Sequence, residues 1–469
     1  MLLNFQINQA IHKYSAKGSN MATQGANRLI RKLKGFELFV YYTHKFMDST
    51  YTPFIRIAIL GEINESILRQ ALNYVQLKHP LLQVCLEESK GEVFFAKMKA
   101  YNVIPLSILK NTNNDEWKNI GLKETRKKFD DEKGPLIKLI LLKDEVNNSH
   151  DLIAVYHHSI ADNISIKTFF KDLLSIYSKI QYNVLNDDDI HELPIPASSL
   201  DPVMAEDFQQ IHIASDKFSI KRLIAQIGDF FITLKKSLIV FFKEIGMKSD
   251  SFQDAILTKE LTTALSNSCH SHNVTLEAFL WAVLLSCIKE EYNQKKYNIA
   301  TLISTRRFYI PKISDEIIGC YLSSYNMQIV TKDLPKDIWI FAKFLNDIVS
   351  TNALANIFNQ PKPPPGKIMP FIMWLIKIKI SLGYFFNSSK LSTIYLSHAG
   401  ELFIQNSSMA LKIRAYNRGG NRFREKSISL LTIILNNELN ISLSSSLLPS
   451  EYTEAIMKKM LSRLMELKN

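Results

Sequence analysis

Apolar residues in the first part of the chain alternate between two patterns. Residues 65–78 and 115–129 show helical patterns of apolar and polar positions. Short apolar runs of strand length lie around them, near residues 54–60, 82–88, 93–97, 136–143 and 152–158. The turn signal Asn147-Asn148-Ser149 joins the last two strands. Helices and strands mixed in this way predict an α+β fold.

The composition changes after residue 185. An acidic run at 186–189 is followed by three prolines, which indicates a linker. We therefore expect an N-terminal half at 1–185, a linker or crossover with a basic amphipathic segment at 186–255, and a C-terminal half at 256–469.

The second half is expected to begin with helices and to continue mainly in strands. The predicted helices cover 257–268, 276–290 and 451–467, and the predicted strands cover 299–304, 392–397, 411–416, 429–435 and 439–444. The run Pro361-Lys362-Pro363-Pro364-Pro365-Gly366 predicts an extended loop between them.

Two adjacent histidines end the apolar run at 152–156. Side chains alternate between the faces of a strand, so only one of His157 and His158 can face a given cleft. An imidazole near its ordinary pKa is suited to take a proton from a hydroxyl or an amine. Asp162 follows four residues later, and a helix with apolar residues at helical spacing begins after it. The pattern predicts a rigid unit that holds a general base at the end of a buried strand.

The stretch from His157 to Asn163 resembles the His-His-x-x-x-Asp-Gly motif of the chloramphenicol acetyltransferase-like superfamily, which includes condensation domains, wax ester synthases and polyketide-associated acyltransferases. The context is similar as well, since Lys78-His79-Pro80, the strand from Gly134 and the segment Ile318–Ser324 follow the order of the family's passages. The resemblance covers roughly residues 28–467. It implies two α/β sandwich halves that form a V around a central tunnel.

The resemblance also assigns roles to residues. His158 is expected to be the catalytic base, and His157 matches the first histidine of the motif, whose role is structural. Asp162 is expected to point away from the substrate and to form a salt bridge with Arg306 or Arg307, which would fix the angle of His158.

Three further positions leave alternatives open. Ser323 and Ser324 are candidates for donors that line the cleft, and they are equally well explained as ordinary strand residues. Asn163 stands where the family has glycine, but asparagine tolerates a positive φ angle better than most residues. The sharp turn after Asp162 is therefore expected to form.

The implied reaction moves an acyl group from a thioester to a hydroxyl or amine of a small-molecule or lipid acceptor. The co-substrate would be acyl-CoA or an acyl-phosphopantetheine on an acyl or peptidyl carrier protein, with no permanently bound cofactor. The alternative is a catalytically silent relative that recruits a carrier or partner protein, and Asn163 in place of glycine keeps that alternative open. A third interpretation is a wax-ester or glycolipid acyltransferase at a membrane.

The charge balance favours anionic partners. The chain holds 57 Lys and Arg against 45 Asp and Glu, which gives a formal net charge of +12. Coenzyme A, an acidic carrier protein or an anionic membrane would fit this charge, and so would a general basic bias of the source proteome. The basic residues are spread among helices and form no recognisable nucleic-acid motif, so we expect no nucleic-acid partner.

The cysteines and histidines predict neither disulfides nor a metal site. Cys85, Cys269, Cys287 and Cys320 are scattered and sit mostly in apolar runs, as expected for reduced thiols in the cytoplasm. His79 and the run Cys269-His270-Ser271-His272 lack a second ligand cluster at suitable spacing. We therefore expect no metal.

Two segments come close to the composition of a membrane span. Residues 223–242 and 368–386 are apolar but interrupted by charged residues. They predict either amphipathic helices at a lipid surface or core helices whose lysines extend outward. The first residues, Met1–Ile7, lack the pattern of a secretory leader. We expect a cytoplasmic monomer, with peripheral membrane contact as the open alternative.

Overall fold

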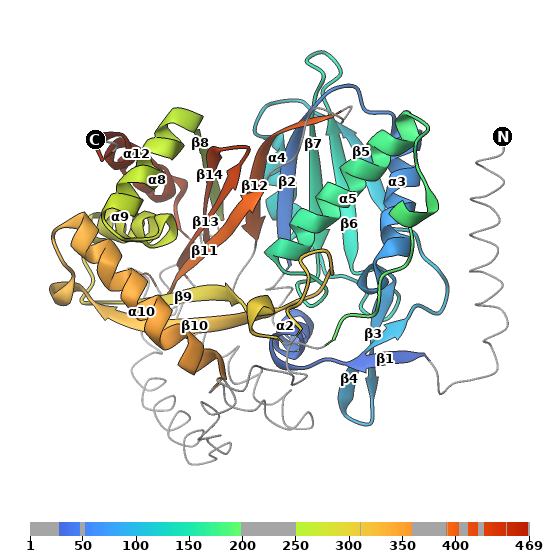
Figure 1. Ribbon diagram of the computed structural model, residues 1–469, viewed down its shortest axis with the longest axis horizontal. Helices are drawn as coiled ribbons and strands as arrows, with labels where there is room; N and C mark the ends of the chain where they lie inside the picture. Colours follow the sequence, from blue (N-terminus) through green and yellow to red (C-terminus); the bar gives the residue numbers. More distant parts are fainter. Residues whose placement is uncertain are drawn as a thin grey trace, which may run out of the picture.

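The computed structural model describes residues 28–46, 52–197, 250–309, 311–358, 391, 393–402, 411–420, 426–446 and 448–467. These residues form three sheets together with the helices that cover them (Figure 1). Helices and strands are mixed along the chain, so the predicted α+β class is confirmed.

The first half is built around a five-stranded sheet with the strand order β12-β2-β7-β6-β5. Its strands are β2 (Pro53–Leu60), β5 (Leu106–Lys110), β6 (Ile137–Lys143), β7 (Ser149–Tyr156) and β12 (Lys412–Gly420). β5 and β6 are parallel, and the other neighbours are antiparallel. β12 comes from the second half of the sequence and pairs with β2, so it joins the two halves.

Helices cover both faces of this sheet. α3 (Glu65–Lys78) and α5 (Asn163–Gln181) pack together over one face, while α4 (Glu116–Glu124) packs against β2, β7 and β12 (Figure 1). Successive residues of β7 enter two different apolar clusters, one shared with α5 and the other with Trp117 of α4. Burial on both faces explains why β7 is an unbroken apolar run rather than an alternating one.

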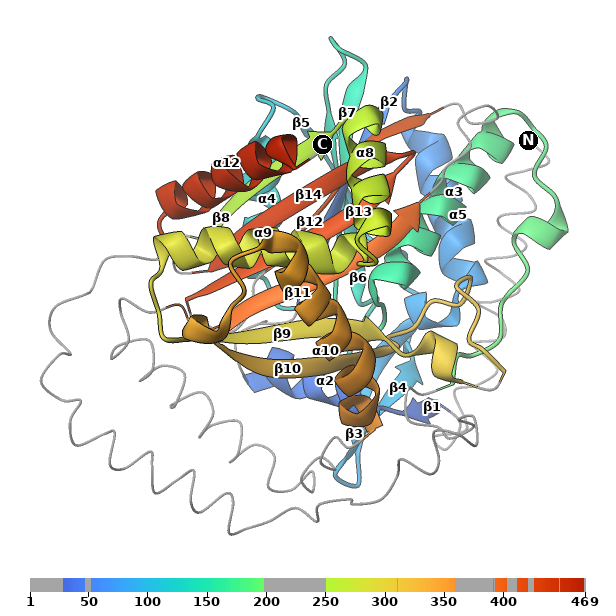
Figure 2. The same cartoon turned by 60° about the vertical axis from the view of Figure 1, so that its left-hand side comes forward.

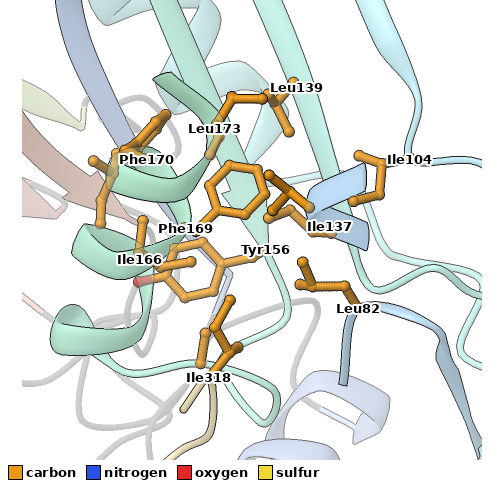
Figure 3. Packing of buried hydrophobic residues seen from close by; sticks show 14 of the residues in the cluster. Leu82, Ile104, Ile137, Leu139, Tyr156, Ile166, Phe169, Phe170, Leu173 and Ile318 are labelled. Atoms are coloured by element: carbon orange, nitrogen blue, oxygen red, sulfur yellow. The ribbon is translucent and has the colours of Figure 1, made fainter. Parts of the chain in front are cut away.

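The core of the first half reaches the end of β7. Figure 3 shows Tyr156, the last residue of that strand, among Ile166 and Phe169 of α5 and close to Ile318 from the second half. All four side chains are almost completely buried. This packing fixes the position of the residues that directly follow the strand.

The second half contains a six-stranded sheet with the order β10-β9-β11-β13-β14-β8. Its strands are β8 (Ser251–Leu257), β9 (Lys296–Ser304), β10 (Leu322–Val330), β11 (Thr393–Leu402), β13 (Ser427–Leu435) and β14 (Glu438–Ser446). The helices are α8 (Lys259–Ser271), α9 (Leu276–Glu291), α10 (Ile338–Phe358) and α12 (Ser450–Glu466), and they lie over one face of the sheet (Figure 2). β8 begins inside the range that the sequence assigned to the linker, and the domain bounds stay a prediction.

A small sheet with the order β1-β4-β3 completes the first half. Its strands are β1 (Leu29–Lys32), β3 (Val84–Ser89) and β4 (Glu92–Lys97), and α2 (Gly35–Phe46) directly follows β1. The sequence patterns located most elements to within a few residues but did not indicate β1, α2, β5, β8, β10 or α10. All four cysteines are buried and free, as predicted.

Within the described ranges, no single helix has both the length and the hydropathy of a membrane span. α8 and α9 satisfy the criteria only as a pair, and they are bent by 99° relative to each other. The segments 223–242 and 368–386 and the proline-rich run at 361–366 lie outside the described residues.

Candidate active site

A short connection between β7 and α5 holds the histidine pair. The His157 N–H donates to the carbonyl oxygen of Leu136 at 2.9 Å. This bond extends the pairing between β7 and β6 by one residue. Asp162 then caps α5, because its side chain accepts a hydrogen bond from the Ser165 N–H at 2.8 Å. The histidines are thus held between a strand end and a helix start.

His158 has a defined tautomer. Its Nδ1 lies 2.7 Å from the carbonyl oxygen of Ala161, and a carbonyl only accepts, so Nδ1 carries the proton. Its Nε2 therefore presents a lone pair, and Nη2 of Arg418 lies 3.1 Å from it. The edge-on rings of Phe36 and Tyr156 flank the imidazole, which is only 1% exposed. A fixed and water-shielded imidazole with a basic Nε2 is what a general base requires.

Arg418 and Tyr416 bring two further polar groups to this position. They are two residues apart on β12 and so share one face of the strand. Among the described residues, neither Nη1 of Arg418 nor the Tyr416 hydroxyl has a hydrogen-bond partner, and both atoms are buried. Burial also raises the pKa of the Tyr416 hydroxyl well above its usual range, so this group stays a donor. Unsatisfied buried donors are rare in folded proteins.

Close approach of strands places Arg418 beside His158. Gly419 pairs with Phe54 of β2, and a Cβ at Gly419 would lie 2.4 Å from the Phe54 ring. Glycine at this position lets β12 lie directly on that ring, which is itself completely buried. The guanidinium of the preceding residue is thereby brought to Nε2 of His158.

Asp162 forms the salt bridge that the sequence left open between two arginines. Arg306 contacts it twice, with Nε at 3.3 Å from Oδ2 and Nη2 at 3.2 Å from Oδ1. The same guanidinium donates through Nη1 to the carbonyl oxygens of Ser314 and Ile317, at 2.7 and 3.0 Å. Both partners of the pair are almost completely buried. Arg307 is exposed, and its guanidinium lies over the ring of Phe308 instead.

The contacts of Asp162 tie the motif to the second half. Its Oδ2 accepts from the Tyr321 N–H at 3.2 Å, and its own N–H donates to the Gly319 carbonyl oxygen at 3.2 Å. Gly319 and Tyr321 belong to the segment 318–324 that the sequence had singled out. The aspartate thus acts as a brace between the motif and that segment, rather than as a proton donor.

His157 is completely buried. Its Nδ1 lies 2.6 Å from Oγ of Ser159, and its ring packs edge-on against His44 of α2. Burial lowers the pKa of His157 well below its usual value, with smaller contributions from the two neighbouring histidines. It therefore stays neutral at physiological pH.

The remaining candidates from the sequence are Ser323, Ser324 and Asn163. Ser323 is buried on β10 opposite Ile303, and the side chain of Ser324 lies outside the described residues. Asn163 is the first residue of α5, and it is not among the residues with a positive φ angle. Its Nδ2 donates to Oγ of Ser397 at 3.4 Å. The expected need for a positive φ angle at Asn163 is therefore wrong, because the helix already begins at this residue.

Sequence reasoning missed three residues of the site. Arg418 and Tyr416 lie on a strand more than two hundred residues beyond the motif, and Phe36 lies on a helix that was not predicted. The doublet Gly419-Gly420 in an otherwise strand-like stretch was the available signal, because glycine inside a strand often marks a close backbone approach.

Comparison with known proteins identifies similar sequences. Residues 39–191 match the model of the Condensation domain family. Among curated proteins, the hybrid PKS-NRPS synthetase traA of Penicillium crustosum is 27% identical over 137 residues, which are 28% of this chain and 3% of that protein. Bacitracin synthase 3 of Bacillus licheniformis is 23% identical over 242 residues, which are 50% of this chain and 4% of that protein. The chain is thus similar to a small part of each.

Solved structures match over nearly the whole chain. The epimerization domain from the third module of tyrocidine synthetase B has a TM-score of 0.61 at 15% identity, covering 95% of this chain and 98% of that one. Trichothecene 15-O-acetyltransferase from Fusarium sporotrichioides has a TM-score of 0.62 at 13% identity, covering 94% and 97%. The chain shares the fold of these two structures, and its residues 39–191 match the Condensation domain family, as the resemblance of the motif implied.

Proposed function

We propose that this protein transfers an acyl group from a thioester, on coenzyme A or on the phosphopantetheine of a carrier protein, to a hydroxyl or amine acceptor. His158 is the general base of the reaction. The observation that carries this proposal is the tautomer of His158, whose Nδ1–H is held 2.7 Å from the Ala161 carbonyl oxygen. That bond directs a basic Nε2 toward the residues of β12.

The reaction proceeds in two steps without an acyl-enzyme. Nε2 of His158 takes the proton from the acceptor as its oxygen or nitrogen attacks the thioester carbonyl carbon. The carbon–oxygen π bond opens, and the oxygen becomes an oxyanion. When the tetrahedral intermediate collapses, the carbon–sulfur bond breaks, and the leaving thiolate takes the proton back from Nε2.

Arg418 and Tyr416 are proposed to stabilise the oxyanion. The acceptor must displace Nη2 of Arg418 from Nε2 of His158, because both use the same lone pair. The released guanidinium, its unsatisfied Nη1 and the Tyr416 hydroxyl then supply donors where negative charge develops. Donors that are already buried and oriented need little reorganisation, and loss of one such donor typically costs about 10²–10³ in rate.

The charge of the chain is consistent with the proposed donor. The formal net charge of +12 favours association with the phosphates of coenzyme A or with an acidic carrier protein. The proposal covers small-molecule and lipid acceptors that attack through an oxygen or a nitrogen.

The test is a panel of thioesters assayed with alcohol and amine acceptors. Free thiol release and the intact mass of the acylated product are measured together, with acyl-CoAs and with acyl carrier proteins as donors. We expect acceptor-dependent thiol release that produces one acylated product for each thiol. Thioester hydrolysis without acceptor dependence, or no turnover with any donor, would contradict the proposal.

One observation favours the second candidate, a catalytically silent protein that binds a carrier or partner protein. In the structure, Arg418 donates to the very lone pair that a base must use. If that contact were permanent, His158 could not act. The wild type would then bind carrier protein and show no acyl transfer, and Arg418→Met would leave that binding unchanged. Under the enzymatic proposal, Arg418→Met changes a measurable rate.

A further inference from the structure

A cluster of two histidines and one aspartate includes the first histidine of the motif and has no part in the proposed reaction. It consists of His44 on α2, Asp131 in the segment before β6, and His157. Their potential ligand atoms all lie within 4.8 Å of one another, and His44 Nε2 is 3.5 Å from Oδ1 of Asp131. The three residues are far apart in sequence and meet only through the fold.

The outer sides of both imidazoles are already engaged. Nδ1 of His44 lies 3.3 Å from Oγ1 of Thr52, and Nδ1 of His157 lies 2.6 Å from Oγ of Ser159. The Thr52 hydroxyl can accept a hydrogen bond from Nδ1–H of His44, which leaves the His44 Nε2 lone pair directed inward. The Ser159 N–H lies 3.3 Å from Nδ1 of His157, so metal binding through Nε2 requires the other tautomer, in which the Ser159 hydroxyl accepts from Nδ1–H. Histidines that bind metal ions commonly have such a partner on the ring nitrogen that faces away from the metal.

The inner sides of the cluster are unsatisfied. Within the part of the chain that the structure describes, Nε2 of His44, Nε2 of His157 and Oδ1 of Asp131 are buried and lack hydrogen-bond partners. A separation of 3.5 Å between His44 and Asp131 is too long for a good hydrogen bond. Three converging atoms without partners are costly for a folded protein, because each loses its hydration.

We propose that His44, Asp131 and His157 form a binding site for one zinc ion. Two imidazole nitrogens and one carboxylate oxygen are a typical set of protein ligands for zinc, and an open fourth position is taken by water. The Asp131 side chain is 19% exposed, so water can approach from its side. None of the three ligands has a chemical role in the proposed acyl transfer.

The geometry requires only a small adjustment. Zinc at about 2.0–2.1 Å from each ligand places ligand atoms roughly 3.3 Å apart. The His44–Asp131 pair is already close to this spacing, and a modest rotation of the imidazole brings His157 nearer. Two nearby lysines are engaged elsewhere: Lys45 with Glu88, and Lys128 with the Lys45 carbonyl oxygen.

A zinc ion here would link three parts of the first half. It would join α2, the segment before β6 and the residue that precedes His158. Its role would be structural, because none of the three ligands takes part in the proposed reaction. The ion would fix the backbone from which His158 projects.

The test uses the full chain, stripped with a chelator, dialysed and then titrated with Zn²⁺ alone. Bound metal is counted by mass spectrometry, and affinity is measured by competition with a coloured chelator. The ligand variants are His44→Asn and Asp131→Asn. The matched control is His79→Asn, because His79 is equally buried but its Nε2 is occupied by Asp172 at 2.8 Å. Asp131 is the most exposed of the three ligands, with 19% of its side chain exposed, so Asp131→Asn disturbs the core least.

We expect wild type and His79→Asn to bind one zinc ion per chain, and each ligand variant to bind it about 10–100-fold more weakly or not at all. Zinc should also raise the melting temperature of the wild type but not that of Asp131→Asn. With Co²⁺ in place of Zn²⁺, the visible absorption of a four-coordinate site should appear in the wild type. A folded wild type without stoichiometric zinc, or ligand variants with wild-type affinity, would overturn the proposal.

Discussion

The pair of Asp162 and Arg306 provides a prediction whose size follows from the structure. In Asp162→Asn, one carboxylate oxygen becomes an NH2 group. In the wild type, Oδ1 accepts from the Ser165 N–H, the Ser165 hydroxyl and Nη2 of Arg306, while Oδ2 accepts from the Tyr321 N–H and Nε of Arg306. Whichever way the amide of the variant is turned, at least two donors lose their acceptor and face another donor.

The expected cost is large for a single substitution. A hydrogen bond to a charged group contributes about 1.5–3 kcal/mol, so loss of two predicts about 3–6 kcal/mol. This agrees with the approximately 3–5 kcal/mol that results when a buried ion pair is broken from one side. A domain with a free energy of unfolding of about 5–15 kcal/mol would stay folded in most of that range.

The assay is urea denaturation of four proteins that form a double-mutant cycle: wild type, Asp162→Asn, Arg306→Met and the double variant. The two partners touch, so we expect a coupling energy of about 0.5–3 kcal/mol. Arg307→Met is the matched control, because Arg307 is exposed and contacts Phe308. The decrease in free energy of unfolding caused by Arg307→Met should add to that caused by Asp162→Asn, without coupling. Additive losses for Arg306, or equal coupling for both arginines, would refute the reasoning.

Three further substitutions have defined outcomes. Gly419→Ala places a Cβ 2.4 Å from the Phe54 ring, so we expect about 1–3 kcal/mol of destabilisation by denaturation and a lower acyl-transfer rate; wild-type stability would contradict the close approach. Burial raises the pKa of Glu277 from 4.5 to about 7, so its ionisation destabilises the fold progressively between those values. Glu277→Gln should therefore gain up to about 3 kcal/mol in free energy of unfolding at about pH 8 and almost nothing at about pH 4. An equal gain at both pH values would exclude ionisation as the cause. Asn163→Gly should cost about 0.5–1 kcal/mol in thermal or chemical denaturation, because glycine loses more entropy in a helix and the bond to Ser397 disappears; a stabilised variant would contradict the helical start.

The sequence predicted best those elements whose burial follows a regular period. β7 is an apolar run covered on both faces, and α5 carries one apolar stripe, so each is visible in local sequence. β5 is a short edge strand of five residues that is largely exposed, and α10 is apolar over most of its length. Neither shows a clear alternation, which explains why both were missed.

The same distinction applies to the site. His158 and Asp162 lie within one short motif and were identified from it. Local sequence could not decide between Arg306 and Arg307, because adjacent residues differ only in the direction of their side chains, which the fold determines. Arg418 could not be placed at all, since it reaches His158 through the pairing of β12 with a strand from the other half.

The central claim is that His158 is the base of an acyl transfer. The most direct measurement compares wild type with His158→Ala in single-turnover thiol release, using the thioester and acceptor that the wild type uses best. The melting temperature of each protein is recorded alongside. The account predicts that the variant stays folded and transfers the acyl group about 10²–10⁴-fold more slowly, because that is the usual contribution of a general base. A folded His158→Ala variant with the rate of the wild type would contradict it.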